Sequence, residues 1–191
     1  MVEEHGFTFV GPSPEHIRRM GDKALARRTM QDAGTPVIPG SDGAVKSVEE
    51  AISWAEKIGY PLRLKASAGG GGRGMRVVRN PDEMEEGWRM GRLEARNAFT
   101  DDSVYLEHSI ERARHIEIQV LGDQHGNVVH LGERECSIQR RHQKLLEESP
   151  SPVVDAALRE RLGAAAVAGA RSISYSGAGT VEFLVDGNGE D

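Results

Sequence analysis

Helix-start residues and short apolar runs alternate along the chain, and together they predict a mixed fold. Ser13, followed by a proline and an acid, begins a helical pattern, and Ser47, Asn80 and Asp155 open three more. The expected helices span 13–34, 47–59, 80–98 and 155–174. Apolar or alternating runs predict strands at 7–10, 62–65, 75–78, 104–106, 116–121, 128–131 and 180–185. Because several strands are separated only by turns, the pattern favours an α+β fold over a doubly wound parallel sheet.

The stretch from Arg114 to Val120 alternates between polar and apolar residues. As a strand it places His115, Glu117 and Gln119 on one face and three aliphatic side chains on the other. A face that carries an imidazole, a carboxylate and an amide suits the wall of a cleft, and a solvated sheet face is the alternative. Zinc binding is disfavoured, because no third ligand lies at metal spacing from His115 and Glu117.

Residues 69–74 form a glycine-rich loop, which is entropically costly to order. The usual reason for such a loop is close approach of backbone N–H groups to phosphate. The loop satisfies G-x-G-x-x-G, but a dinucleotide fingerprint opens a helix, whereas residues 75–78 predict a strand. A P-loop is excluded because the loop does not end in Gly-Lys-Ser/Thr. A glycine loop between two strands, with Lys65 ending the first, fits a flap over a triphosphate, and a surface hairpin without a ligand is the alternative.

Composition and charge narrow the classes of partner. The chain has 24 basic and 30 acidic residues, and this net charge of −6 argues against a nucleic-acid binder. No apolar run is long enough to cross a bilayer, so we expect no membrane partner. Cys136 is the single cysteine, which excludes an internal disulfide and indicates a reducing, cytoplasmic compartment. A packing role is favoured for it over a nucleophilic one.

Five longer motifs occur in order along the chain. They are Gly11-Pro-Ser-Pro14 with Met20 to Lys23, Tyr60-Pro61 with Lys65 to Val78, Arg114 to Val120, Glu133 to Lys144, and Gly177 to Phe183. Through these motifs the chain resembles the biotin carboxylase family, the ATP-grasp ligases of acetyl-, propionyl- and pyruvate-type carboxylases. The resemblance implies an α+β, ATP-grasp fold with a small glycine-loop lid subdomain and an incomplete antiparallel-sheet subdomain. It implies a remnant of the N-terminal domain with a linker helix at 1–43, the lid at 44–108 and a truncated C-terminal subdomain at 109–191.

The resemblance also implies a reaction and its participants. In the family, ATP phosphorylates bicarbonate to carboxyphosphate, which delivers CO₂ to biotin on a carrier domain. Magnesium or manganese would assist the nucleotide, because the chemistry is charge neutralisation around a phosphoryl group. The biotin carrier domain and a carboxyltransferase would be partners of the parent protein, itself expected to be a homodimer. The alternatives are another bicarbonate-activating ATP-grasp ligase, such as the large subunit of carbamoyl phosphate synthetase, and a non-catalytic nucleotide-binding module.

Matching positions in the family motifs imply the site residues. The resemblance assigns ATP binding to Lys23, Lys65, Gly70, Gly71, Gly72, Met75, Glu107, Ile110, His115, Gln139 and His142. It makes Lys144 the catalytic lysine, beside the bicarbonate and the transferred phosphoryl group, and Glu182 a magnesium ligand. On spacing alone, Lys144 would belong to a solvated basic loop. Glu182 lies between apolar neighbours on its strand, and a carboxylate there calls for a metal or a cationic partner.

The chain departs from the family pattern at both ends and at one inner position. Nearly all of the family's N-terminal domain would precede this sequence, and a second metal-binding glutamate, an asparagine and a catalytic arginine would follow it. Residues 186–189 are expected to form a hairpin turn without its return strand. We therefore expect a fragment that binds nucleotide weakly and does not complete carboxylation. Arg63 stands where the family prefers an apolar residue.

Overall fold

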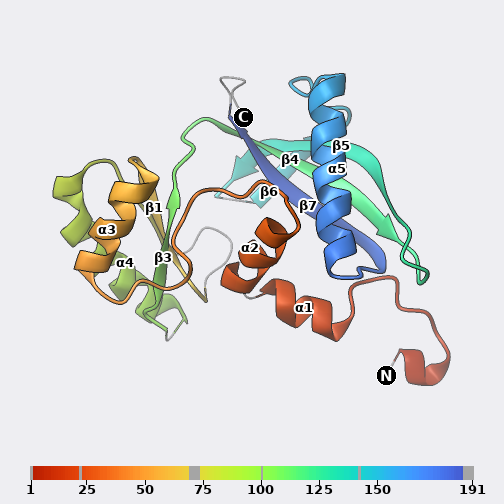
Figure 1. Ribbon diagram of the computed structural model, residues 1–191, viewed down its shortest axis with the longest axis horizontal. Coiled ribbons are helices and arrows are strands. Elements are labelled where there is room, and N and C mark those ends of the chain that lie inside the picture. Colours follow the sequence, from red (N-terminus) through yellow and green to blue (C-terminus); the bar gives the residue numbers. More distant parts are fainter. Residues whose placement is uncertain (1, 22, 69–73, 100, 142, 187–191) are drawn as a thin grey trace.

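The computed structural model describes residues 2–21, 23–68, 74–99, 101–141 and 143–186. These residues form two antiparallel sheets that lie side by side in Figure 1, each with its own helices. The smaller sheet contains β2 (Met75–Val78), β1 (Leu62–Ala66) and β3 (Val104–His108), in that order. The larger sheet contains β6 (Gln143–Glu148), β5 (Val128–Arg140), β4 (Ala113–Gly122) and β7 (Gly177–Asp186). Two antiparallel sheets with separate helices confirm the α+β prediction.

Helices α3 (Val48–Ile58) and α4 (Met84–Phe99) pack against the smaller sheet. Ser47 caps α3 as predicted, because its Oγ accepts a hydrogen bond from the Glu50 N–H at 3.2 Å, and Gly59 ends the helix. A glycine on α4 allows this helix to approach the sheet closely, since a Cβ on Gly87 would lie 2.6 Å from Val78 Cγ2. The core of this half contains Leu62, Leu64, Met84, Val104 and Leu106.

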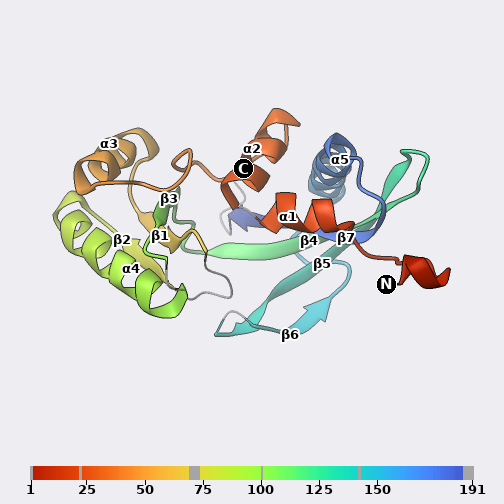
Figure 2. The ribbon, with the colours of Figure 1, turned by 90° about the horizontal axis from the view of Figure 1, so that it is seen from below.

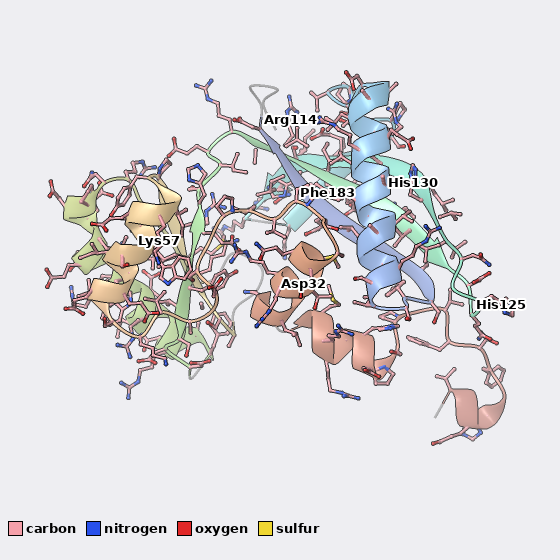
Figure 3. All side chains as sticks on the ribbon, viewed as in Figure 1. Asp32, Lys57, Arg114, His125, His130 and Phe183 are labelled. Atoms are coloured by element: carbon pink, nitrogen blue, oxygen red, sulfur yellow. The ribbon has the colours of Figure 1, made fainter. Side chains whose placement is uncertain are left out.

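Helix α5 (Ala156–Ser172) lies on one face of the larger sheet (Figure 1). Asp155 caps it as predicted, with Oδ1 accepting a hydrogen bond from the Leu158 N–H at 2.8 Å. His130 and Phe183, labelled in Figure 3, come from β5 and β7. Gly163 of α5 leaves room for the imidazole, because a Cβ there would lie 2.5 Å from the His130 ring. The core of this half contains Ile118, Val120, Val128, Ala166 and Ala170, with Phe183 packed against it.

Helix α2 (Lys23–Asp32) and the segment after it connect the two halves. Arg27 Nη1 donates a hydrogen bond to the Ser41 carbonyl at 2.8 Å, and the Ser41 N–H in turn donates to Leu106 of β3 at 2.9 Å. Thr35 Oγ1 donates to the Ala165 carbonyl of α5 at 3.1 Å. Figure 2 shows α1 (Pro14–Gly21), α2 and α5 on the same side of the larger sheet. None of the helices in the described ranges is long and apolar enough to cross a membrane.

Several boundaries differ from the prediction. The strand expected at 7–10 is wrong: those residues form no strand, and Val10 contributes only its carbonyl, which accepts a hydrogen bond from Ala178 at 3.0 Å. The helix expected over 13–34 appears as α1 and α2, with residue 22 between them outside the described residues, and the third expected helix begins as a 3₁₀ turn, η2 (Pro81–Glu83). A further turn of this kind, η1 (Glu3–His5), opens the chain. Strand β6 escapes the pattern because all its residues are exposed and Leu145 and Leu146 are adjacent, which breaks the alternation.

Candidate active site

The polar face of the larger sheet carries a cluster of opposite charges. Glu117 on β4 lies directly across from Arg134 on β5 and from Glu182 on β7. The Arg134 Nε donates to the Glu117 carboxylate at 2.8 Å and lies 3.5 Å from a carboxylate oxygen of Glu147 on β6. Lys144, also on β6, forms ion pairs with both Glu117 and Glu182 through its ammonium group. We call Glu117, Arg134, Lys144, Glu147 and Glu182 the sheet cluster.

Irregular pairing between β5 and β6 brings Lys144 to this face. The register of the two strands shifts between Glu135 and Ile138 and again between Ile138 and Gln139. Such irregularities bend and twist a strand pair. The bend explains how a side chain of β6, at one edge of the sheet, reaches Glu182 on β7 at the other edge.

Burial separates the two carboxylates that bind Lys144. The side chain of Glu117 is 8% exposed and that of Glu182 is 61% exposed. Burial alone would raise the pKa of Glu117, but hydrogen bonds from Lys144 and Arg134 outweigh it and lower this pKa. Burial alone would lower the pKa of Lys144, but hydrogen bonds to Glu117 and Glu182 raise it. Lys144 therefore stays protonated between the two facing carboxylates, which would repel each other without its positive charge.

A second cluster lies near the end of β1, just before the glycine loop. Lys65 forms an ion pair with Glu107 on the neighbouring strand β3. Lys23 of α2 donates a hydrogen bond to the Ala66 carbonyl at 3.3 Å, and its Nζ lies 5.8 Å from the centre of the Tyr105 ring. Burial and the nearby Lys65 ammonium lower the pKa of Lys23. We call Lys23, Lys65 and Glu107 the lid cluster.

An open groove of about 670 Å³ runs along β7, with α2, the segment after it and α5 as its other walls. Glu107 and Ile110 line the groove from the direction of the smaller sheet, and Glu182 lines it from the larger sheet. Lys65 and Lys144 do not line it, so the groove holds only one end of the candidate site. Its size is in the range of small-molecule sites.

The other candidate residues lie on the strands of the two clusters or outside the described residues. Met75 on β2 lies across from Lys65 of the lid cluster. Gln139 on β5 lies across from Lys144 of the sheet cluster, and His115 lies on β4, two residues before Glu117. The structure thus brings the candidates together in two groups rather than one. Gly70, Gly71, Gly72 and His142 lie outside the described residues.

Comparison with known proteins decides the family. The sequence model of the family described as carbamoyl-phosphate synthase L chain, ATP binding domain, matches residues 22–191. The chain belongs to this family. Among its relatives, the biotin carboxylase of Nostoc sp. is 57% identical over 187 residues, which cover 98% of this chain and 42% of the relative.

Solved structures of biotin carboxylases share the fold of this ATP-binding domain. The biotin carboxylase-beta-gamma-ATP complex from Campylobacter jejuni is 53% identical with a TM-score of 0.89, and the match covers 98% of this chain and 42% of that one. The biotin carboxylase domain dimer of Hydrogenobacter thermophilus 2-oxoglutarate carboxylase, in complex with MgADP, ADP and bicarbonate, is 52% identical with a TM-score of 0.89, at the same coverage. These matches confirm the resemblance to biotin carboxylases and the ATP-grasp fold. The chain spans less than half the length of the relatives it matches.

The sequence of this ATP-binding domain did not single out two members of the sheet cluster, Arg134 and Glu147. The alternation of β4 places Glu117 on the polar face, and the motif that ends at Lys144 contains Arg134. Nothing in the pattern pairs Glu117 with Lys144, which lies 27 residues away, or brings Glu147 to Arg134. The missing information is the cross-strand register, which becomes visible only in the folded sheet.

Cys136 adds a thiol to the sheet cluster. Possible metal-ligand atoms of Glu117, Cys136 and Glu147 lie within 4.8 Å of one another. The Arg134 guanidinium already contacts both carboxylates, and a bound metal would have to displace it. Burial, with the negative charges of Glu117 and Glu147, raises the pKa of the buried Cys136 thiol to about 11. A metal ligand or nucleophile is the thiolate, so this protonated thiol fits the predicted packing role.

Proposed function

We propose that this chain is the ATP-binding part of a biotin carboxylase, in which ATP and bicarbonate give carboxyphosphate and carrier-bound biotin accepts the carboxyl group. One observation carries the proposal: the two clusters have opposite charge. The lid cluster has two ammonium groups and one carboxylate, whereas the sheet cluster has three carboxylates and two cations. A nucleoside triphosphate with its divalent cation has the matching charges.

The lid cluster would bind the phosphates. Lys23 and Lys65 come from different elements, and each ammonium is partly removed from water, which strengthens its attraction for an anion. Gly70, Gly71 and Gly72 keep the role that the family resemblance implies, as a lid over the triphosphate. On this proposal residues 44–108 act as the lid subdomain, residues 109–191 as the truncated C-terminal subdomain, and residues 1–43 as a remnant of the N-terminal domain with the linker helix.

Glu182 fits a ligand of magnesium. Its carboxylate is exposed, and Mg²⁺ binds proteins through one or two carboxylates while keeping waters and phosphate oxygens as further ligands. Manganese accepts the same oxygen donors, so either metal fits. The bound metal would neutralise negative charge on the transferred phosphoryl group. Lys144, charged and placed next to Glu182, would hold the bicarbonate and the phosphoryl oxygens in position as the catalytic lysine.

The groove end at Glu107 and Ile110 would receive the adenine and ribose. An aliphatic side chain beside a carboxylate suits a flat, mostly apolar base with a few polar atoms on its edge. Met75, across from Lys65, would border the same pocket. The remaining nucleotide contacts implied by the family are His115, Gln139 and His142.

The partners and setting of the whole protein belong to the same proposal. They are the biotin carrier domain, the carboxyltransferase, a second copy in a homodimer, and a cytoplasmic location. The expected absence of a nucleic-acid partner rests on the acidic balance of the chain.

Calorimetric titration of the chain with MgATP tests the proposal. We expect binding by the wild type and an affinity loss of about tenfold or more in Lys65→Met, because a charge-assisted contact to phosphate contributes roughly 1.5–3 kcal/mol. Lys46→Met, which removes an equal charge outside both clusters, should bind as the wild type does. Absence of MgATP binding in the wild type, or equal losses in both variants, would contradict the proposal.

A second candidate function is supported by the family description, which names carbamoyl-phosphate synthase. That enzyme class also activates bicarbonate with ATP, as the resemblance implies. The two candidates differ in the acceptor of the carboxyl group. Stimulation of bicarbonate-dependent ATP cleavage by free biotin, measured on the complete parent protein, supports the biotin carboxylase, and stimulation by an ammonia donor instead supports the second candidate.

A further inference from the structure

The ammonium group of Lys144 occupies the carboxylate that the proposed metal needs. It forms ion pairs with Glu117 and Glu182 at the same time. Its contact on Glu182 is with Oε1, and a divalent cation bound to the same carboxylate places further positive charge a few ångströms from the ammonium. Lys144 and the metal therefore oppose each other at Glu182, because two cations that close together repel each other.

The two carboxylates hold Lys144 unequally. Glu117 is 8% exposed and is also held by Arg134, whose Nε donates to it at 2.8 Å. Glu182 is 61% exposed, and Lys144 is its sole cationic partner among the residues that the structure describes. Glu182 is therefore the more accessible of the two carboxylates to water and to a metal ion. Glu182 is thus the carboxylate that a metal takes, and Glu117 is the one that keeps the lysine.

We propose that the Lys144–Glu182 ion pair is a built-in competitor of metal binding. A divalent cation at Glu182 displaces the lysine, which stays tethered to Glu117 and gains a free N–H donor for an anionic substrate beside the metal. Release of the catalytic lysine is thereby coupled to arrival of the metal. This inference rests on the proposed role of Glu182 and adds to it a regulation of the same site.

Competition of this kind is reciprocal. If the metal weakens the hold of Glu182 on Lys144, then loss of the Lys144 ammonium must strengthen metal binding by the same factor. Coupling between neighbouring sites is commonly about fivefold or more, so a five- to tenfold gain in metal affinity is expected for a neutral side chain at this position.

Binding of Mn²⁺ to the full chain without nucleotide measures this coupling, with free Mn²⁺ followed by electron paramagnetic resonance. The probe is the metal alone. The wild type is compared with Lys144→Met and with Lys46→Met, which removes a lysine outside both clusters. We expect the dissociation constant to fall about five- to tenfold in Lys144→Met and to stay unchanged in Lys46→Met. Equal affinity of the wild type and Lys144→Met, weaker binding by Lys144→Met, or no Mn²⁺ binding by either protein overturns the inference.

Glu182→Gln separates the inference from the proposed function beneath it. If Glu182→Gln loses Mn²⁺ binding while Lys144→Met leaves it unchanged, the metal ligand stands and the competition fails. If Glu182→Gln binds Mn²⁺ as the wild type does, the metal role of Glu182 fails, and the competition fails with it. Tighter Mn²⁺ binding by Lys144→Met together with loss of Mn²⁺ binding in Glu182→Gln supports both the metal role of Glu182 and the competition.

A measurement on the unsubstituted lysine guards against a variant that does not fold. NMR of the lysine side chains in ¹³C-labelled protein leaves every ammonium unmodified and follows each lysine through its own ¹³Cε–Hε resonance. Addition of Mg²⁺ should shift the resonance of Lys144 and leave those of Lys46 and Lys57 in place. A Lys144 resonance that does not move while Mg²⁺ binds overturns the inference.

Discussion

The lid cluster and the sheet cluster are both built on neighbouring antiparallel strands, yet their charges are balanced in opposite ways. The lid cluster contains two lysines and the single carboxylate of Glu107, which pairs with Lys65. The sheet cluster pairs Lys144 and Arg134 with three carboxylates. An excess of ammonium suits an anion, and an excess of carboxylate suits a metal ion. On the proposed function, the two sheets would divide the recognition of a metal–triphosphate complex between them.

The clusters also differ in the number of cationic side chains that contact their central carboxylate. Glu117 accepts hydrogen bonds from two cationic side chains, whereas Glu107 forms one ion pair among the described residues, with Lys65. A buried carboxylate with several charged partners is part of the fold as well as part of the site. Substitutions in the two clusters should therefore differ in what they damage first.

The largest expected effect is on stability. It is tested by the same substitution, glutamate to glutamine, in each cluster. Glu117→Gln leaves Arg134 and Lys144 without their shared buried partner, and we expect the free energy of unfolding to fall by about 3 kcal/mol. Glu107→Gln removes one ion pair, and the expected loss is about 1 kcal/mol. Urea denaturation followed by circular dichroism measures both. Equal losses in the two variants would show that the clusters do not differ in this respect.

The next effect is a division of ligands between the clusters. Lys65→Met should weaken binding of metal-free tripolyphosphate about tenfold, or about 1.4 kcal/mol, and leave Mn²⁺ binding unchanged. Glu182→Gln should weaken Mn²⁺ binding and leave tripolyphosphate binding unchanged, because the carboxylate that it removes attracts cations and not anions. Calorimetry with each ligand alone gives the four affinities. If either variant weakens the binding of both ligands equally, the two clusters act as one site and do not differ in the ligand that they bind.

A smaller effect concerns pH and the lid cluster alone. The pKa of Lys23 is lowered from its ordinary value of 10.5 by burial and by Lys65, so its ammonium loses its proton at a lower pH than an exposed lysine does. Since the protonated form attracts the anion, affinity for metal-free tripolyphosphate should fall about threefold as the pH rises through this lowered pKa. The raised pKa of Lys144 keeps the sheet cluster charged over the same range. Lys23→Met should abolish the step and Lys57→Met should retain it; a step that survives in Lys23→Met belongs to another group.

How much of this contrast the sequence predicts depends on the distance along the chain. Local signals predict α3 from Ser47 and the strands on both sides of the glycine loop, and they place Lys65 at the end of β1. The sheet cluster depends on register: Glu117 meets Glu182 and Lys144 only after β4, β5, β6 and β7 have paired. The error at 7–10 has the same cause, since among the described residues one hydrogen bond, from Ala178 of β7 to the Val10 carbonyl, takes the place of a strand ladder. Cross-strand pairing is a property of the whole sheet and not of any one segment.

The smallest expected effect is on the reactivity of the Cys136 thiol, which depends on the excess of carboxylates in the sheet cluster. Its pKa of about 11 has burial as the first cause, followed by the negative charges of Glu117 and Glu147. Glu147→Gln removes one of these charges, lowers the thiol pKa, and should accelerate the slow reaction with iodoacetamide at pH 8 about twofold. Glu148→Gln is the matched control. Glu148 lies across from Glu135 on β5, whereas Glu147 contacts Arg134 of the sheet cluster. Mass spectrometry of the intact chain follows the rate, and equal acceleration by both variants would mean that the thiol senses the overall charge of the chain rather than that of the cluster.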